Sequence, residues 1–400
     1  MKRKVSGEKT NKTFMVLSFI GICMVISGHI FTTPVLNIFG NFFTFNSFFM
    51  PMFIFISGYF FKDEYLDSFW KFFKKKFLKL MLYYFIWNLI YGIIMSIRRA
   101  AVGGPDLPIN FYTLFIEPFV DGGQFGINIP SWFIPTLFTV EIAYWFVRKI
   151  EVKLVGEKCV PSAVILAIIF AVINMGVVWF AKHVGFSGAL LVLGKIGFFM
   201  AFYYMGAIYN RYLEKWETKI PSAVIFIVCP LTNAFLMIFF ETIEFPNLFI
   251  LNKFMAPVFY PIITSTTGIL FWLRISRLIA PAISKSKIVN MISNNTKDIM
   301  MHHLFFITIT QLVMFGILKA IGLADDYAPS AIYQGLGDVF YYPHHGALFF
   351  SAILFLVGLF APLGVKHLQE KFINWLKRFF NTNGGLATNP KRRSTRRNGR

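Results

Sequence analysis

Ten apolar segments follow one another along the 400-residue chain, and each is long enough to cross a lipid bilayer as a helix. A crossing takes roughly 20 residues, since an α-helix rises about 1.5 Å per residue. Of all residues, 56% are hydrophobic and 14% are charged, whereas about 25% are charged in a typical soluble domain. We therefore exclude a soluble globular protein and predict an all-α polytopic membrane helix bundle. The ten predicted spans are 14–33, 42–61, 81–97, 130–147, 161–181, 189–209, 221–240, 255–273, 299–320 and 346–364.

The basic residues strongly prefer one set of connecting segments. With ten spans both termini lie on one side of the membrane, and 33 of the 39 Lys and Arg residues fall in the segments on that side. Cytoplasmic loops of membrane proteins carry such an excess. We therefore predict that both termini are cytoplasmic. Because membrane orientation explains the net charge of +20, nucleic acid is not expected as a partner.

Three regions are predicted along the chain. Residues 1–13 form a basic cytoplasmic N-terminus, 14–365 form the transmembrane domain, and 366–400 form an amphipathic segment with a disordered basic tail. We expect this tail to contact anionic membrane lipid rather than RNA. The first apolar run is longer than the core of a signal peptide and lacks a cleavage pattern, so we interpret it as a retained helix. Segment 62–80 mixes aromatic residues with Lys, which predicts an interfacial helix leading into the third span.

The informative residues are five ionisable ones within predicted spans, where such groups are costly and often functional. His29 lies in the outer third of the first span, and Glu141 lies roughly 16 Å below the outer end of the fourth. Lys195 lies in the sixth span, and His302 and His303 lie in the inner part of the ninth. Adjacent residues on a helix point about 100° apart, so we expect one of these two histidines to be structural.

The other three residues also have structural interpretations. His29 could serve only to hydrogen-bond across helices. Glu141 could brace the bundle by pairing with a Lys or Arg. For Lys195 we expect the side chain to extend outward to the membrane surface.

A histidine within the membrane suits proton transfer, because imidazole exchanges a proton near neutral pH. A base that removes the proton of an alcohol lets the oxygen attack a thioester directly. The chain has no G-x-S-x-G nucleophile motif. No metal is expected, because the three cysteines are far apart and the adjacent histidine pairs at 302–303 and 344–345 lie on opposite sides of the membrane.

Four stretches of the chain carry recognisable patterns. "GICMVISGHI" is followed by "SFFMPMFIFISGYFFK", and then by "PSWFIPTLFTVEI" (130–142) and "NNTKDIMMHHLFF" (294–306). In this order, and over roughly residues 12–365, they resemble the integral-membrane acyltransferase 3 family. In that family a first span ends in G-H and a second reads F-F-M-P-L-F-F-F-I-S-G-Y. The later stretches are similar to its W-F-L-x-x-L-F and N-S/T-x-x-I-Y-L-L-H elements.

The resemblance implies an enzyme of the bacterial inner membrane. Such a protein is an O-acyltransferase that moves an acyl group, most often acetyl, from acyl-CoA to a hydroxyl of an extracytoplasmic carbohydrate or polysaccharide. It implies acyl-CoA as a donor substrate and no permanently bound cofactor. His29 matches the histidine of the family's first span, which implies the general base. The position 11 residues earlier, where many members have Arg or Lys, is Ser18 here.

The resemblance also implies a donor site at the cytoplasmic side. The family's R-x-x-R element after the second span corresponds to Lys76-x-x-Lys79, and Lys74 and Lys75 adjoin it. Lysine meets the phosphates of coenzyme A as a point charge, without the bidentate geometry of arginine. A plain cytoplasmic basic run explains the same lysines. The spacing from the Asn-Thr pair favours His303 over His302 as the match to the family's L-L-H histidine.

These residues predict a cavity lined by the first, fourth and ninth spans, with Glu141 orienting the site. On a straight-helix topology His29 lies about 15–20 Å from His302 and His303, so we expect these histidines to serve different steps. The rival function is a polytopic exporter or flippase of a glycan or small molecule. It is less favoured because residues 14–181 and 189–364 show no clear repeat. A non-catalytic scaffold fits poorly with the buried ionisable residues.

Overall fold

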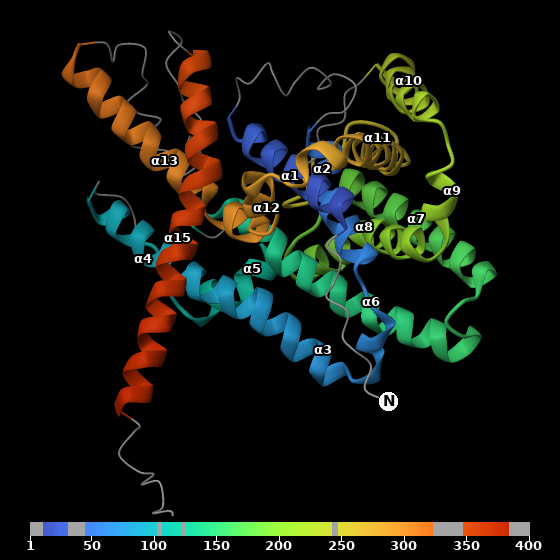
Figure 1. Cartoon of the computed structure of the whole chain (residues 1–400), viewed down its shortest axis with the longest axis horizontal. Coiled ribbons are helices and arrows are strands. Elements are labelled where there is room, and N and C mark those ends of the chain that lie inside the picture. Colours follow the sequence, from blue (N-terminus) through green and yellow to red (C-terminus); the bar gives the residue numbers. More distant parts are fainter. Residues whose placement is uncertain are drawn as a thin grey trace, which may run out of the picture.

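The structure is a computed structural model that describes residues 11–30, 45–101, 106–121, 125–241, 247–322 and 347–383. All regular elements in these ranges are helical, apart from one isolated bridge between Asn247 and Asn252. The α-helices are α1 (Lys12–Gly28), α2 (Phe45–Tyr59), α3 (Phe69–Lys76), α4 (Leu82–Ala101), α5 (Glu117–Val120), α6 (Phe133–Val155), α7 (Val160–His183), α8 (Gly188–Ile208), α9 (Glu214–Glu217), α10 (Ser222–Phe240), α11 (Tyr260–Ile283), α12 (Lys287–Ser293), α13 (Thr296–Ala320) and α15 (Ala347–Asn383) (Figure 1).

Short 3₁₀ and π turns join several of these helices. The 3₁₀ turns are η1 (Asp63–Asp67) and η4 (Ile129–Trp132), and the π turns are η2 (Phe77–Met81), η3 (Tyr112–Ile116) and η5 (Tyr209–Leu213).

The described part of each of the ten predicted spans falls largely on a helix, which confirms the all-α polytopic fold. Within the described ranges, seven helical stretches are long and apolar enough to cross a membrane, and they contain α4, α7, α8, α10, α11, α13 and α15. α1 and α2 are apolar but shorter, and α6 has 23 residues of which five are charged. The protein is therefore a multi-pass membrane protein. The count of ten and the cytoplasmic side of the termini stay predictions, and the tail beyond residue 383 lies outside the described residues.

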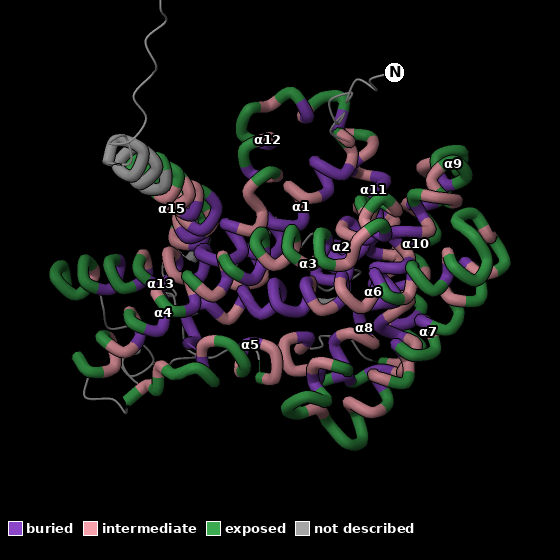
Figure 2. Tube along the Cα trace, turned by 90° about the horizontal axis from the view of Figure 1, so that it is seen from below, coloured by how far each residue is buried: buried purple, intermediate pink, exposed green. Residues whose placement is uncertain are grey.

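The centre of the bundle is a close contact between α2 and α8. A Cβ at Gly58 would lie 2.0 Å from the carbonyl oxygen of Tyr203, and one at Gly206 would lie 2.0 Å from that of Phe55. Glycine at both positions therefore lets the two backbones touch, as small residues do in membrane helix pairs. Buried residues concentrate in α1, α2 and α8 (Figure 2).

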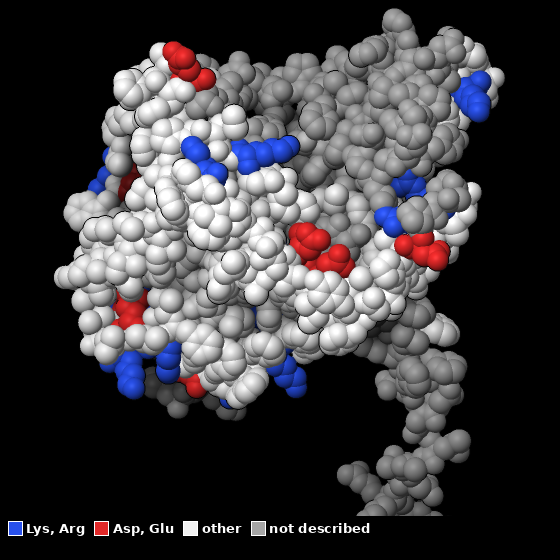
Figure 3. Space-filling model, turned by 180° about the vertical axis from the view of Figure 1, so that it is seen from behind, with Lys and Arg blue, Asp and Glu red and all other residues white. Residues whose placement is uncertain are grey.

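The outer helices expose apolar side chains. α7 and α10 present rows of Ile, Val, Leu and Phe to the surroundings, as expected of a surface that faces lipid tails. Much of the face seen in Figure 3 is uncharged, and several Lys and Arg residues gather along its lower edge. Figure 1 shows α3 and the end of α15 at this same end of the molecule.

The predicted interfacial helix at 62–80 is continuous with the third span. Ser68 caps α3 by accepting a hydrogen bond from the backbone N–H of Lys71, and the chain then runs from Phe69 to Ala101 as one helical stretch with the π turn η2 inside it. The wide turn of η2 changes the direction in which the following side chains point. It lies at the stretch that carries Lys76 and Lys79.

Candidate functional site

His29 lies at the end of α1, beside His303 of α13. α1 ends at Gly28, and the backbone N–H of His29 closes the helix by donating to the carbonyl of Ile26. The imidazole rings of His29 and His303 have centroids 5.1 Å apart. The expected separation of about 15–20 Å is therefore wrong, because the two residues are direct neighbours.

The helix α12 explains this difference. It packs against the first turns of α1, where Val289 joins a buried cluster with Met15 and Val16. The chain has thus already passed the start of α1 when α13 begins at Thr296. The straight-helix expectation took no account of this packing. The offset brings His303, the eighth residue of α13, to the end of α1.

His303 has one ring nitrogen fixed and the other open. Its Nδ1 lies 2.9 Å from the carbonyl oxygen of Ile299 and 3.1 Å from that of Met300. A carbonyl only accepts, so Nδ1 carries the proton and donates it, and Nε2 carries the free lone pair. Nε2 is buried and has no hydrogen-bond partner among the described residues. The ring therefore presents an unprotonated nitrogen in the interior, next to His29.

His302 points to a different neighbour, α4, and both of its ring nitrogens are hydrogen-bonded. Nδ1 lies 2.6 Å from the hydroxyl of Tyr91, and Nε2 lies 3.0 Å from that of Tyr83. The indole of Trp87 packs edge-on against the ring, with centroids 4.3 Å apart. The expectation that the adjacent histidines have different surroundings matches this geometry.

The hydrogen-bond directions around His302 follow from Asp298. The hydroxyl of Tyr83 donates to the Asp298 carboxylate at 2.7 Å, so its oxygen accepts from Nε2–H of His302. Nδ1 of His302 then accepts from Tyr91. Lys366 of α15 approaches Asp298 at 3.8 Å and holds the far end of this chain. The result is a closed network that ties α4, α13 and α15 together.

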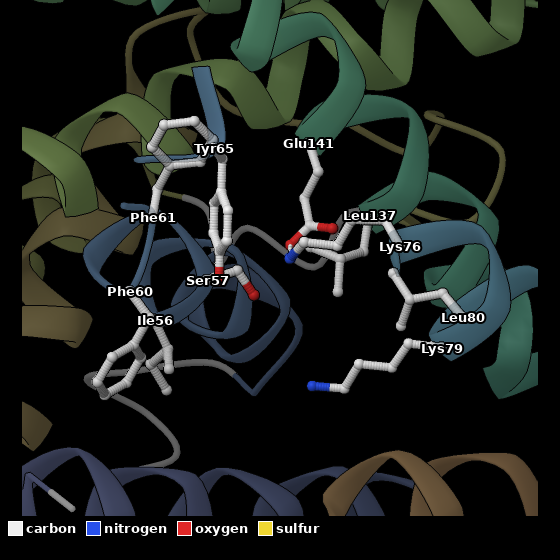
Figure 4. A pocket seen from close by; sticks show the side chains of 10 residues that line it. All are labelled: Ile56, Ser57, Phe60, Phe61, Tyr65, Lys76, Lys79, Leu80, Leu137 and Glu141. Atoms are coloured by element: carbon white, nitrogen blue, oxygen red, sulfur yellow. Dashed lines mark hydrogen bonds and ion pairs between the residues drawn. The ribbon is translucent and has the colours of Figure 1, made fainter. Parts of the chain in front are cut away.

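Lys76 and Lys79, predicted to bind the donor, line one cavity of about 320 Å³ together with Glu141, which was predicted to orient the reacting site. Figure 4 shows Lys76 and Lys79 on one side and the rings of Phe61 and Tyr65 on the other. Nζ of Lys76 pairs with Oε1 of Glu141 at 2.5 Å, and Oε2 has no partner in the described part of the chain. The bracing pair considered for Glu141 is therefore present. We call this cavity, which Lys76 and Lys79 line, the lysine pocket, and we call His29 with His303 the histidine pair. The Glu141 carboxylate lies in the lysine pocket rather than beside the histidine pair.

The cavity also differs from the prediction in its other members. Lys74 and Lys75 do not line it: both are exposed, and Lys75 donates to the hydroxyl of Tyr65 at 3.2 Å. Tyr65 and Ser57 do line it, and sequence reasoning missed both. The only sequence pattern that could have indicated Ser57 is its place within "ISGY". No sequence pattern indicated Tyr65, because its position depends on the fold of η1.

The pocket adjoins the first turn of α13. Nζ of Lys297 donates to the carbonyl oxygen of Lys79 at 3.2 Å. Lys297 precedes His303 by six residues, which is about 9 Å along the helix. The lysine pocket and the histidine pair are therefore linked through one turn and a half of α13.

Two further predicted positions have clear surroundings. Lys195 is 2% exposed, so the expectation that it extends to the membrane surface is wrong. α8 is packed on several sides, which leaves this side chain no route outward. Ser18 donates to the carbonyl of Phe14 in its own helix at 2.9 Å and brings no charge towards His29.

Comparison with known proteins identifies the chain. The family described as an acyltransferase domain, acyltransferase 3, matches residues 16–359. No curated protein and no solved structure matches it significantly. The match covers most of the 400 residues and includes α1, the lysine pocket and α13. This chain belongs to the acyltransferase 3 family.

Proposed function

We propose that this protein is a membrane-embedded O-acyltransferase that moves an acyl group, most often acetyl, from acyl-CoA to a hydroxyl of a carbohydrate outside the cytoplasm. The family match supports acyl transfer in general. The observation that carries the proposal is the contact between His29 and His303, with the open Nε2 of His303 beside it.

The histidine pair is suited to activate the acceptor. His29 removes the proton of the acceptor hydroxyl as its oxygen attacks the thioester carbonyl. The new C–O bond forms, the C–S bond breaks, and the thiolate of coenzyme A takes up the proton. His303 contributes the second nitrogen at this point: Nδ1 is held by its own helix, so the ring cannot turn and Nε2 stays directed into the interior.

The lysine pocket is suited to hold the donor. Coenzyme A carries phosphates, and an ammonium attracts them as a point charge. Lys79 forms no ion pair with the described residues, whereas Lys76 is neutralised by Glu141. In this proposal Lys79 is the first cation to meet a phosphate. The link from Lys79 through Lys297 to α13 gives the thioester a short route to His303.

The proposed setting is the inner membrane of a bacterium, with both termini and the lysine pocket on the cytoplasmic side. The carbohydrate or polysaccharide acceptor then approaches the histidine pair from outside. Membrane lipid covers the apolar outer helices, and no permanently bound cofactor enters the proposed chemistry.

The test uses full-length protein purified into lipid nanodiscs, with [¹⁴C]acetyl-CoA and envelope polysaccharide as probes. We expect label on the polysaccharide, and its loss in His29→Ala. His183→Ala is the matched control, because His183 is an exposed histidine on α7 whose ring bonds to and stacks on Trp179 of the same helix. Undiminished transfer in His29→Ala would falsify the role of His29. In sealed proteoliposomes, polysaccharide movement without label would support the exporter instead.

A further inference from the structure

Lys195 places an ammonium group inside the protein without an acceptor for its hydrogen bonds. It is the eighth residue of α8 and is 2% exposed. Its Nζ has no hydrogen-bond partner among the residues that the structure describes. An ammonium carries three N–H donors, and a buried charge without a partner is strongly unfavourable. The mechanism proposed above does not use this residue.

Trp132 is the one neighbour that holds this ammonium by a directed contact within the described residues. Nζ lies 5.3 Å from the centroid of the indole ring, which is a cation–π distance. Trp132 is itself packed between Phe133 and Phe199, with centroids 6.1 Å away in each case. The aromatic face fixes the position of the charge, but it supplies no oxygen to receive the N–H groups.

A buried polar network fixes the position of Trp132. The hydroxyl of Ser131 donates to the carbonyl of Asn128 at 2.6 Å, and the amide of Asn128 donates to Asn88 of α4 at 3.2 Å. These contacts anchor η4, the turn that ends at Trp132. Lys195 and Trp132 thus form a rigid, preorganised pair. Such preorganisation favours ligand binding, since little order is lost on association.

The pair lies on the acceptor side of the proposed enzyme. Lys195 is about 10 Å from the start of α8, the end that faces outward in the predicted topology. α5 packs against α8. η4 also contacts α13, the helix of His303. A group bound at Lys195 therefore lies beside η4, an element that contacts the helix of His303.

We propose that Lys195 and Trp132 form a subsite for an anionic group of the acceptor, a carboxylate or a phosphate. An anionic oxygen supplies the acceptor that Nζ lacks, and the resulting charge-assisted hydrogen bond is strong away from water. A neutral sugar hydroxyl would leave the positive charge uncompensated. Assignment of the bound anion to the acceptor rests on the proposed function, whereas binding of the anion itself does not.

The binding test uses the full chain in nanodiscs without any acyl donor. The probes are methyl β-D-glucuronide, the 6-phosphate of methyl β-D-glucoside and methyl β-D-glucoside itself, which share one ring and differ in charge. Calorimetric titration should show at least one anionic probe binding about tenfold tighter than the neutral one, and the better probe distinguishes carboxylate from phosphate. Lys195→Met should reduce this preference to less than twofold. Lys319→Met, an exposed lysine in the last turn of α13, should keep it.

Thermal unfolding provides a second measurement that does not depend on the probes. Because methionine has similar length and no charge, Lys195→Met should raise the Tm of the unliganded protein by about 2 °C or more. A lower Tm would show that Lys195 is a structural partner and would overturn the proposal. So would equal affinity for the three probes, absence of binding by both anionic probes, or a preference that survives in Lys195→Met.

The two proposals fail in different ways. Anion preference without label transfer rejects the enzyme and keeps the subsite. Label transfer without anion preference rejects the subsite and keeps the enzyme.

Discussion

His302 and His303 are adjacent in the chain, equally buried, and placed in opposite chemical situations. His302 faces α4, and both of its nitrogens are engaged by tyrosine hydroxyls. His303 faces α1, with Nδ1 bonded to its own helix and Nε2 open beside His29. The difference arises because neighbouring residues on a helix point about 100° apart. It teaches that a buried histidine serves structure when both nitrogens are satisfied, and is available for chemistry when one is not.

The contrast also extends to what each residue holds together. The His302 network joins three helices through Tyr83, Asp298 and Lys366. The His29–His303 contact joins only the end of α1 to α13 and leaves a lone pair unused. We therefore expect mutations in the first region to act on stability, and those in the second to act on rate.

The largest expected effect is a loss of activity at His303, whose Nε2 has no partner among the described residues. His303→Ala should lower acetyl transfer by about 100-fold or more, since a positioned base contributes roughly that factor. Its Tm should stay within about 2 °C of the parent, because among the described residues the ring hydrogen-bonds only to carbonyls of its own helix. Transfer assays and thermal unfolding on the same preparation check the loss of activity and the unchanged Tm. An inactive variant that is also strongly destabilised would break the comparison.

The next largest effect is a loss of stability at His302, both of whose ring nitrogens are hydrogen-bonded. His302→Ala should destabilise the fold by roughly 2–4 kcal/mol, since the buried Tyr91 hydroxyl loses its histidine partner, Tyr83 loses one of its two partners and Trp87 loses a packing surface. Transfer measured well below the Tm should stay within about tenfold of the parent. Tyr83→Phe removes a single hydroxyl and should cost roughly 1–3 kcal/mol. Loss of transfer in His302→Ala without loss of stability would contradict its structural role.

A smaller effect is expected at the lysine pocket. It also contains one group with an ion-pair partner and one without. Lys79 is free of ion pairs within the described residues, whereas Lys76 pairs with Glu141. Lys79→Met should raise the KM for acyl-CoA by about tenfold with little change in kcat, as expected when uniform substrate binding is lost. Lys74→Met, exposed and outside the cavity, is the control and should change KM less than twofold. Equal effects of both substitutions would show that the lysines between residues 74 and 79 act only as a diffuse positive charge.

The smallest effect is expected at the end of the His302 network. Lys366 is 35% exposed and lies 3.8 Å from Asp298. Because Lys366 is partly exposed, approaches Asp298 only at long range and also donates to Asn295, Lys366→Met should lower stability by about 1 kcal/mol. The loss should shrink further as salt is raised, because salt screens exposed charges. A larger, salt-independent loss would place Lys366 inside the network rather than at its edge.

The sequence predicts the membrane bundle well, because long apolar segments have few alternatives to spanning helices. It also predicts His29, His303 and the Lys76–Lys79 stretch as candidates. It could not predict that His29 and His303 touch, since their levels depend on how α12 packs against α1. Nor could it predict the burial of Lys195 or the part played by Tyr65, because both depend on contacts between helices far apart in the chain.

If His29 and His303 act together at one reacting centre, a double-mutant cycle should show strong coupling between them. Transfer from [¹⁴C]acetyl-CoA would be measured for His29→Ala, His303→Ala and the double variant, each checked for folding. The account predicts that each single variant loses about 100-fold or more, and that the double variant falls no more than about threefold below the weaker single, since residues that act as a unit are non-additive. A double variant whose loss equals the product of the two single losses would show that the histidines act in separate steps, and would contradict the account.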